Sequence, residues 1–322
     1  MNAYTAPLLK ANPLGVRDTI FALDTVEGLT QQPKHLLPKY FYDAAGSELF
    51  EQITRLPEYY PTRTELGILR DRGAEIASVI PRHAALVEFG AGSTLKVRLL
   101  LQTCAIKTYV PVDISGDYVA AQADSLRADF PDLAVHPVSA DFTAPFALPE
   151  AVRDMPKVGF FPGSTLGNFE PHEASQFLRR AAEILGRDAI MIVGIDLEKN
   201  ERVLHAAYND AAGVTAKFNL NLLVRMNREL GANFDLSSFV HRAIYNRELH
   251  RIEMHLISRK AQTARVCGRT ISFRAGESIH TENSYKYSPD RFSALAHGAG
   301  WSPVAAWSDA ENMFSVQALR AV

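Results

Sequence analysis

The stretch Ala84-Ala85-Leu86-Val87-Glu88-Phe89-Gly90-Ala91-Gly92 decides the fold of this chain. Its apolar first part is typical of a buried strand, and two closely spaced glycines follow it. A helix is predicted directly after the glycines, over about residues 94–102. A strand, a glycine turn and a helix N-terminus together form a nucleotide-binding arrangement. The backbone can approach a ligand there, and the first N–H groups of the helix are free to bind it.

Strands and helices continue to alternate beyond this motif. We expect strands at about 108–112, 134–138, 158–161 and 189–195, with helices at about 118–130 and 171–185. Such alternation over five strands predicts an α/β fold with a parallel, doubly wound, Rossmann-like sheet.

The segments before and after this alternation predict a second, mixed α+β domain. Helices are expected at about 17–29, at 47–55, and from an N-cap at Thr62 or Thr64 to Val79, with a loop at Tyr59-Tyr60-Pro61. Residues 199–230 have the pattern of a helix, and strands are expected from 239 to 287. A helix is expected at 289–297, followed by strands at 303–307 and 314–318. We therefore predict one domain from 61–198 with 287–322, and another from 1–60 with 199–286.

Composition excludes several classes of protein. The 322 residues carry 34 basic and 36 acidic side chains. The chain therefore lacks the excess of basic residues that would indicate a nucleic-acid partner. The apolar run Ala189–Ile195 is too short to span a membrane. Cys104 and Cys267 cannot form a disulfide framework, which is typical of a protein in the reducing cytoplasm. We also expect a monomer. No His-Glu-x-x-His motif and no closely spaced cysteine and histidine ligands occur, so no metal is predicted.

The glycine turn favours S-adenosylmethionine (SAM) over a dinucleotide. A dinucleotide motif needs a third glycine where this chain has Leu95, whereas SAM has no pyrophosphate to accommodate. Asp113 ends the second strand and can accept both ribose hydroxyls. Asp141-Phe142 ends the third strand, where it can meet the edge and face of adenine. Lys96 can pair with the methionine carboxylate.

Three further motifs are specific to one family: Phe41-Tyr42-Asp43, the run from Leu56 to Glu65, and Gly163-Ser164-Thr165-Leu166-Gly167-Asn168. With them the sequence resembles the L-histidine N-alpha-methyltransferases of ergothioneine biosynthesis, from about Pro33 to the C-terminus. The resemblance implies a class I methyltransferase fold and a substrate-binding domain. It also implies trimethylation of the α-amino group of L-histidine to hercynine, with SAM converted to S-adenosylhomocysteine (SAH).

The resemblance also implies roles for single residues. SAM is held by the residues matching Gly90, Lys96, Asp113, Asp141 and Phe142. Tyr42, Asn168 and Tyr208 match those that hold the amino and carboxylate groups of histidine, and Tyr42 and Asn168 are expected to act in catalysis. Tyr59, Glu282 and Ser284 match the imidazole site, with Met254 nearby. Pro162, Asn283, Tyr285 and Tyr287 depart from the pattern of relatives and leave the exact substrate preference open.

The sequence leaves open which group takes the proton of the substrate amine and which function the chain has. Asn168 and Tyr42 can accept N–H bonds from the amine, and either Tyr42 or water can take its proton. Glu282 and Ser284 are two residues apart, so in a strand they share one face and can bind the imidazole together. A methyltransferase for another amino acid or aromatic amine, or a SAM-binding regulator without turnover, remains an alternative.

Overall fold

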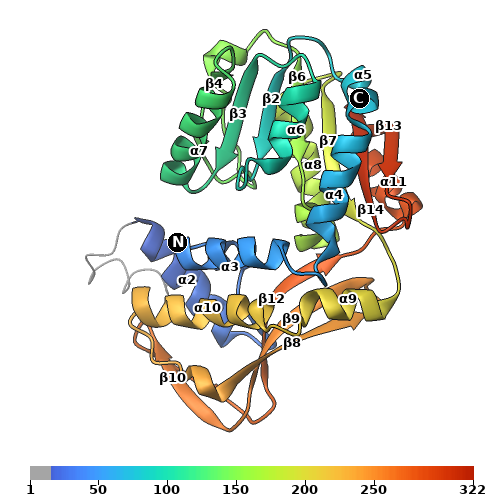
Figure 1. The fold of residues 1–322 in the computed structure, drawn as a ribbon. Coiled ribbons are helices and arrows are strands. Elements are labelled where there is room, and N and C mark those ends of the chain that lie inside the picture. Colours follow the sequence, from blue (N-terminus) through green and yellow to red (C-terminus); the bar gives the residue numbers. More distant parts are fainter. Residues whose placement is uncertain (1–15) are drawn as a thin grey trace. The chain divides into compact units, whose positions relative to one another are not determined.

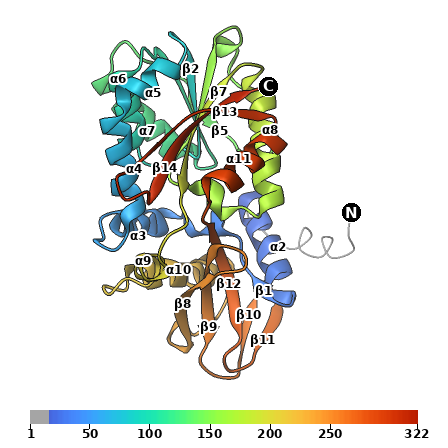
Figure 2. The same cartoon turned by 90° about the vertical axis from the view of Figure 1, so that its right-hand side faces the viewer.

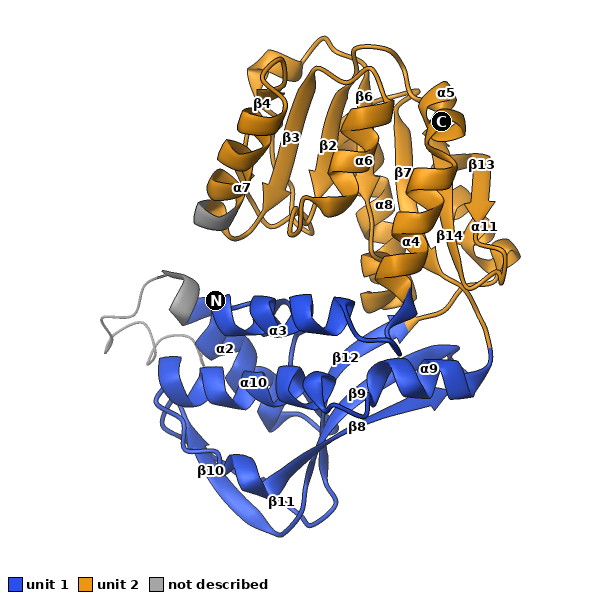
Figure 3. Ribbon diagram, in the orientation of Figure 1, with its two compact units in different colours: residues 1–60, 200–284 blue, residues 61–199, 285–322 orange. Residues whose placement is uncertain are grey.

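The computed structural model describes residues 16–322, except for the side chains of residues 16–18, 117 and 118. The chain divides into two compact units (Figure 3). Unit 1 combines the segment ending at Tyr60 with Asn200–Ser284, and unit 2 combines Pro61–Lys199 with Tyr285–Val322. Residues 1–15, which the sequence assigned to the second domain, lie outside the described part.

Unit 2 contains the sheet that begins at the glycine motif (Figure 1). The strand order is β13-β14-β7-β6-β2-β3-β4, with β5 also paired to β3. The strands are β2 (Ala85–Phe89), β3 (Thr108–Asp113), β4 (Ala134–Val135), β5 (Val138–Ser139), β6 (Lys157–Phe161), β7 (Ile190–Asp196), β13 (Trp301–Ser308) and β14 (Phe314–Ala321). Strands β2 to β7 run parallel, whereas β14 is antiparallel to both of its neighbours. Since β3 and β6 flank β2 on opposite sides, the sheet is doubly wound, and the predicted fold class is confirmed.

Helices cover both faces of this sheet, as Figures 1 and 2 show. They are α4 (Tyr60–Asp71), α5 (Gly73–Val79), α6 (Leu95–Thr103), α7 (Gly116–Asp129), α8 (Pro171–Leu185) and α11 (Pro289–Gly298), with short 3-10 turns η2 (Glu150–Val152) and η3 (Thr165–Asn168). Helices α4 to α7 pack on the face that presents Leu86 and Phe160, and α8 and α11 on the face that presents Val87 and Phe161. The alternation of side chains along each strand thus supplies two apolar cores.

Three predicted elements differ from the structure. The helix expected from Thr62 or Thr64 begins at Tyr60, because Pro61 is tolerated in a first turn, and it breaks at Arg72 into α4 and α5. The strand expected at 134–138 is two short pieces, since Pro137 between them has no N–H to donate to a ladder. The helix expected at 199–230 is α9 (Glu201–Tyr208) and α10 (Val214–Glu229). Asp210 divides them by accepting the N–H groups of the first turn of α10.

Unit 1 combines a four-stranded sheet, a hairpin and helices. The sheet order is β1-β12-β9-β8, and β10 pairs with β11 (Figure 2). These strands are β1 (Lys34–His35), β8 (Phe239–Asn246), β9 (Arg251–Ser258), β10 (Gln262–Val266), β11 (Arg269–Phe273) and β12 (Ser278–Tyr285). The remaining elements are α2 (Val16–Thr30), η1 (Pro38–Phe41), α3 (Ala44–Thr54), α9, α10 and η4 (Leu236–Ser238). Helix α10 packs between α3 and the sheet: Phe218 lies 6.0 Å from Phe50 of α3 between ring centroids, and Asn219 donates to the carbonyl of His255.

Candidate active site

The glycine turn of unit 2 is shaped for close approach. Gly90 has a φ of +74°, in the left-handed region that favours glycine. A Cβ at Gly90 would lie 3.2 Å from the ring of Phe142, so the absence of a side chain lets this ring lie against the turn. The N–H groups of Gly90 and Ala91 both donate to the carbonyl of Val112, which fixes the turn against β3. The structure therefore brings Gly90 and Phe142, two of the residues assigned to the cofactor from the sequence, into contact.

Two carboxylates lie at neighbouring strand ends of unit 2. Asp113 ends β3, and its Oδ1 accepts the N–H of Ser115 at 2.8 Å. Burial raises the pKa of the Asp113 carboxyl, against the opposing effect of backbone N–H donors. Asp141 follows β5 and holds its own loop, because its Oδ1 accepts from the N–H and the hydroxyl of Thr143. Both acids lie at the edge of the sheet where doubly wound folds bind ligands.

Lys96 on α6 is paired within the protein. Its Nζ lies 2.6 Å from Oε2 of Glu65, a carboxylate of α4 that is only 1% exposed. The same carboxylate accepts the N–H of Gly163, at 3.0 and 2.9 Å to its two oxygens. Sequence reasoning missed Glu65. It stands in the family run that ends at this residue, but a glutamate in a helix normally lies on the solvated face.

The loop that carries Asn168 is held at several points. Gly163 is bound to Glu65, and the hydroxyl of Ser164, a residue with φ of 57°, accepts the N–H of Asp196 at 2.9 Å. Gly167 packs so tightly on Tyr285 that a Cβ would lie 2.8 Å from the Tyr285 carbonyl oxygen. Asn168 ends η3, and this fixed loop defines its backbone position.

Most of the remaining predicted residues lie in unit 1, where aromatic rings connect them. Tyr42 packs edge-on against Phe50 at 5.7 Å between ring centroids, and Phe50 packs in the same way on Tyr59 at 6.3 Å. Tyr59 in turn lies 6.3 Å from Tyr208, whose hydroxyl is 2.7 Å from that of Ser284. The structure therefore brings together three of the predicted tyrosines and Ser284. Phe50, the link between them, was not predicted, since one aromatic residue on an amphipathic helix normally indicates core.

Two further predicted residues occupy adjacent strands of unit 1. Glu282 on β12 is partly exposed, and its carbonyl is 3.1 Å from Nε2 of His280. Met254 on β9 is buried, and its carbonyl accepts from the hydroxyl of Thr281 at 3.0 Å. Their neighbours Tyr285 and Tyr287 belong to unit 2 and are buried there, with the Tyr285 hydroxyl donating to Glu170 at 2.6 Å.

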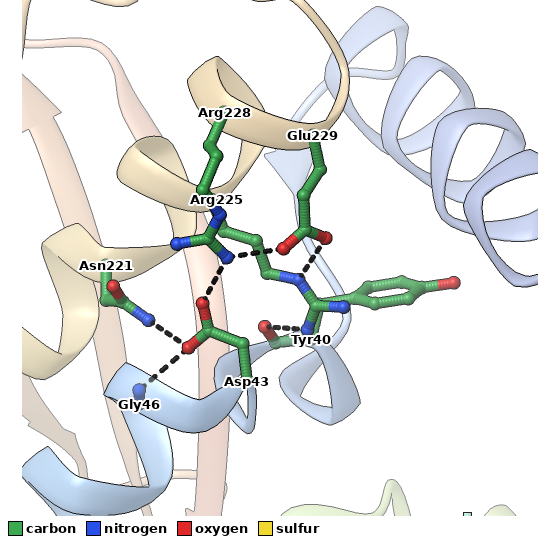
Figure 4. A network of polar contacts seen from close by, with 7 residues as sticks. All are labelled: Tyr40, Asp43, Gly46, Asn221, Arg225, Arg228 and Glu229. Carbon is green, nitrogen blue, oxygen red and sulfur yellow. Dashed lines mark hydrogen bonds and ion pairs between the residues drawn. The ribbon is translucent and has the colours of Figure 1, made fainter. Parts of the chain in front are cut away.

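A polar network joins Tyr40 and Asp43, the residues that flank the segment of Tyr42, to side chains of α10 (Figure 4). Asp43 caps α3 by accepting the Gly46 N–H at 2.7 Å, and it also accepts from Asn221 at 2.7 Å and from Arg228 at 2.6 Å. Arg225 donates to the Tyr40 carbonyl at 3.0 Å. Burial raises the pKa of the Asp43 carboxyl, but the donors around it outweigh burial and leave the pKa below its usual value.

Glu253, His255 and His280 bring three potential metal ligands within 4.8 Å of one another, among the described residues. The two imidazole rings, however, are stacked 4.9 Å apart with an interplanar angle of 23°. A metal ion lies close to the plane of each imidazole that binds it, and two rings stacked face to face direct their nitrogen lone pairs into separate planes. Glu253 also accepts from Arg251 and Asn246. The arrangement does not fit an ion, and we assign none to it.

Comparison with known proteins decides the family. A sequence model described as histidine-specific methyltransferase, SAM-dependent, matches residues 21–321. The chain belongs to this family. It is therefore a SAM-dependent methyltransferase, and the residues around Gly90 are those expected to hold the cofactor. In residues 16–322, no helix has the length and apolar character needed to cross a membrane.

Individual relatives agree with this family. A histidine N-alpha-methyltransferase of Mycolicibacterium smegmatis is 41% identical over 91% of this chain and 92% of its own length. Ergothioneine biosynthesis protein 1 of Neurospora crassa is 29% identical over 86% of this chain, which spans 32% of that protein. Among solved structures, the CcbJ methyltransferase of Streptomyces caelestis is similar with a TM-score of 0.46 and 16% identity, over 79% of this chain and 89% of that one.

Proposed function

We propose that this enzyme transfers three methyl groups to the α-amino nitrogen of L-histidine and so forms hercynine, the first step of ergothioneine biosynthesis. The observation that carries the proposal is the 41% identity with a histidine N-alpha-methyltransferase over nearly the full length of both chains. The relative named for ergothioneine biosynthesis supports the place in the pathway. Cytoplasmic location and a monomeric state remain predictions.

In this proposal unit 2 holds the cofactor. Asp113 accepts the ribose hydroxyls, Asp141 and Phe142 bind adenine, and Lys96 pairs with the methionine carboxylate. The contact between Gly90 and the Phe142 ring, which places this ring beside the glycine turn, supports this assignment. When bound, SAM supplies an electrophilic methyl group, and the protein's main contribution is to position the acceptor amine.

The amine must be neutral to react, and its lone pair must be aimed. Asn168 can accept an N–H bond from the amine and donate to the carboxylate with the same amide. Tyr42 can accept a second N–H bond, and either Tyr42 or water removes the proton. Tyr208 donates to the carboxylate. The anchored loop supports a fixed position for Asn168, and the Asp43 network supports one for Tyr42.

Selectivity is assigned to Tyr59, Glu282 and Ser284. Glu282 accepts the imidazole N–H, and the hydroxyl of Ser284 donates its proton to the other ring nitrogen, which leaves the proton of Tyr208 for the carboxylate of histidine. A site that hydrogen-bonds a polar side chain rejects apolar analogues, because its own groups would be left unpaired. Met254 is proposed to pack near the ring.

Competition between amino acids tests this assignment. Histidine, phenylalanine and tryptophan are offered together with SAM to the wild type and to Glu282→Ala, with Glu248→Ala, an exposed residue of the same unit, as the control. The histidine preference is expected to fall by roughly one to three orders of magnitude in Glu282→Ala, through loss of a charged hydrogen bond and of the rejection of apolar rings. An unchanged ratio of products would remove Glu282 from the imidazole site.

A further inference from the structure

Glu65 links two parts of unit 2 that the proposed function uses. Its buried carboxylate accepts the N–H of Gly163, which begins the loop leading to Asn168, and forms an ion pair with Lys96 on α6. The side chain of Lys96 is 17% exposed and that of Glu65 1%. One carboxylate therefore orients both a lysine assigned to the cofactor and the start of a loop assigned to the substrate.

The Glu65 carboxylate fits against the sheet because residue 194 of β7 is a glycine. A Cβ on Gly194 of β7 would lie 2.1 Å from Oε1 of Glu65, closer than any non-bonded contact allows. Gly194 itself is on a fully buried strand. The position of Glu65 is thus fixed from three sides: by the glycine of the strand, by the loop N–H and by the lysine ammonium.

The positive charge of Lys96 is balanced by the negative charge of Glu65. Glu88 on β2 interacts electrostatically with both Lys96 and Glu65, and burial raises the pKa of Glu88 to about 8. At neutral pH Glu88 is therefore mostly protonated, and the negative charge that balances Lys96 comes from Glu65. An unbalanced ammonium in a partly buried site would repel another cation nearby. SAM carries a sulfonium charge, whereas its product SAH has a neutral sulfur.

We propose that Glu65 is a positioning residue that also neutralises Lys96, so that this lysine can pair with the cofactor's carboxylate without disfavouring the sulfonium of SAM. The inference rests on the proposed function in one respect, the assignment of Lys96 to the cofactor. It adds a residue that touches neither ligand but sets the ratio of SAM to SAH affinity.

Calorimetry with SAM and with SAH tests the proposal on the full chain. Glu65→Gln keeps the shape and an acceptor for the Gly163 N–H but removes the charge. The dissociation constant for SAM is expected to rise about tenfold more than that for SAH, on the order of one screened charge interaction. Glu183→Gln, an exposed change on α8 of the same unit, is the control and should leave both constants unchanged.

The outcomes separate charge from structure. Equal weakening of SAM and SAH would mean that Glu65 acts only through structure, and no weakening would overturn the whole inference. If Glu65→Gln does not fold, Lys96→Met gives the complementary test: the retained Glu65 charge should shift the ratio toward SAM, and a shift toward SAH contradicts the proposal. These measurements involve no amino acid, so they stand even if histidine is not the substrate. A wild type that does not bind SAM would instead refute the proposed function.

Discussion

Replacing Asp43 with alanine should remove the hydrogen bonds that join the segment of Tyr42 to Asn221 and Arg228 of helix α10. The change removes the cap of α3, which costs about 1 kcal/mol. It also leaves the amide of Asn221, which is 5% exposed, without its carboxylate partner, at about 1–3 kcal/mol. The half-exposed Arg228 pair adds at most about 1 kcal/mol. We therefore expect the free energy of unfolding to fall by roughly 3 kcal/mol.

The functional effect of Asp43→Ala should be confined to histidine. Asp43→Ala removes the side-chain bonds that tie the backbone after Tyr42 to Gly46, Asn221 and Arg228, whereas the Arg225 bond to the Tyr40 carbonyl remains, so kcat/KM for histidine should fall about tenfold. SAM affinity should not change, because the residues assigned to SAM belong to unit 2. Asp43→Asn, which still caps the helix, is the milder control. Urea denaturation, calorimetry with SAM and initial rates measure the three quantities. A loss below about 1 kcal/mol with unchanged kcat/KM would refute the positioning role.

The Asp43 network also predicts a dependence on pH. The pKa of this carboxyl is lowered in the folded protein. Its stabilising contribution is therefore complete above the unfolded value of about 3.9 and is lost as pH falls toward the folded value. The difference in stability between the wild type and Asp43→Asn should shrink on acidification through this range.

Other predictions concern the sheet and the two ligands. Asp113→Ala should weaken SAM binding at least tenfold, from the ~1.5–3 kcal/mol of a charged hydrogen bond, and unchanged affinity by calorimetry would exclude the ribose assignment. Asn168→Ala should impair histidine binding and methylation while SAM still binds, and wild-type histidine affinity would exclude its role. Burial raises the pKa of Glu88 from 4.5 to about 8, so the folded state retains a proton that the unfolded state releases, and stability should fall as pH rises between these values. Glu88→Gln should remove about 4 kcal/mol of that fall between pH 5 and 9, and identical pH profiles would show that Glu88 is ionised.

The sequence predicted the sheet and much of the site because both follow local patterns. The stretch from Ala84 to about residue 102 shows the patterns of a buried strand, a glycine turn and a helix in succession, and Asp113 and Asp141 follow from the carboxyl ends of the next strands. The partners of these residues were not predictable. Glu65 lies within a helix and Asp43 at a helix N-cap, where acids normally face solvent, and their burial depends on contacts with residues far along the chain. Only tertiary structure brings Lys96 to Glu65, or Asn221 to Asp43.

Incubation of the purified chain with SAM and L-histidine tests the central claim most directly. Mass spectrometry should show histidine gaining up to three methyl groups, with SAH formed in step, and NMR should place all of them on the α-nitrogen. SAH should not accumulate without histidine. Methylation of the imidazole ring, or binding of SAM with no methylated histidine, would contradict the account.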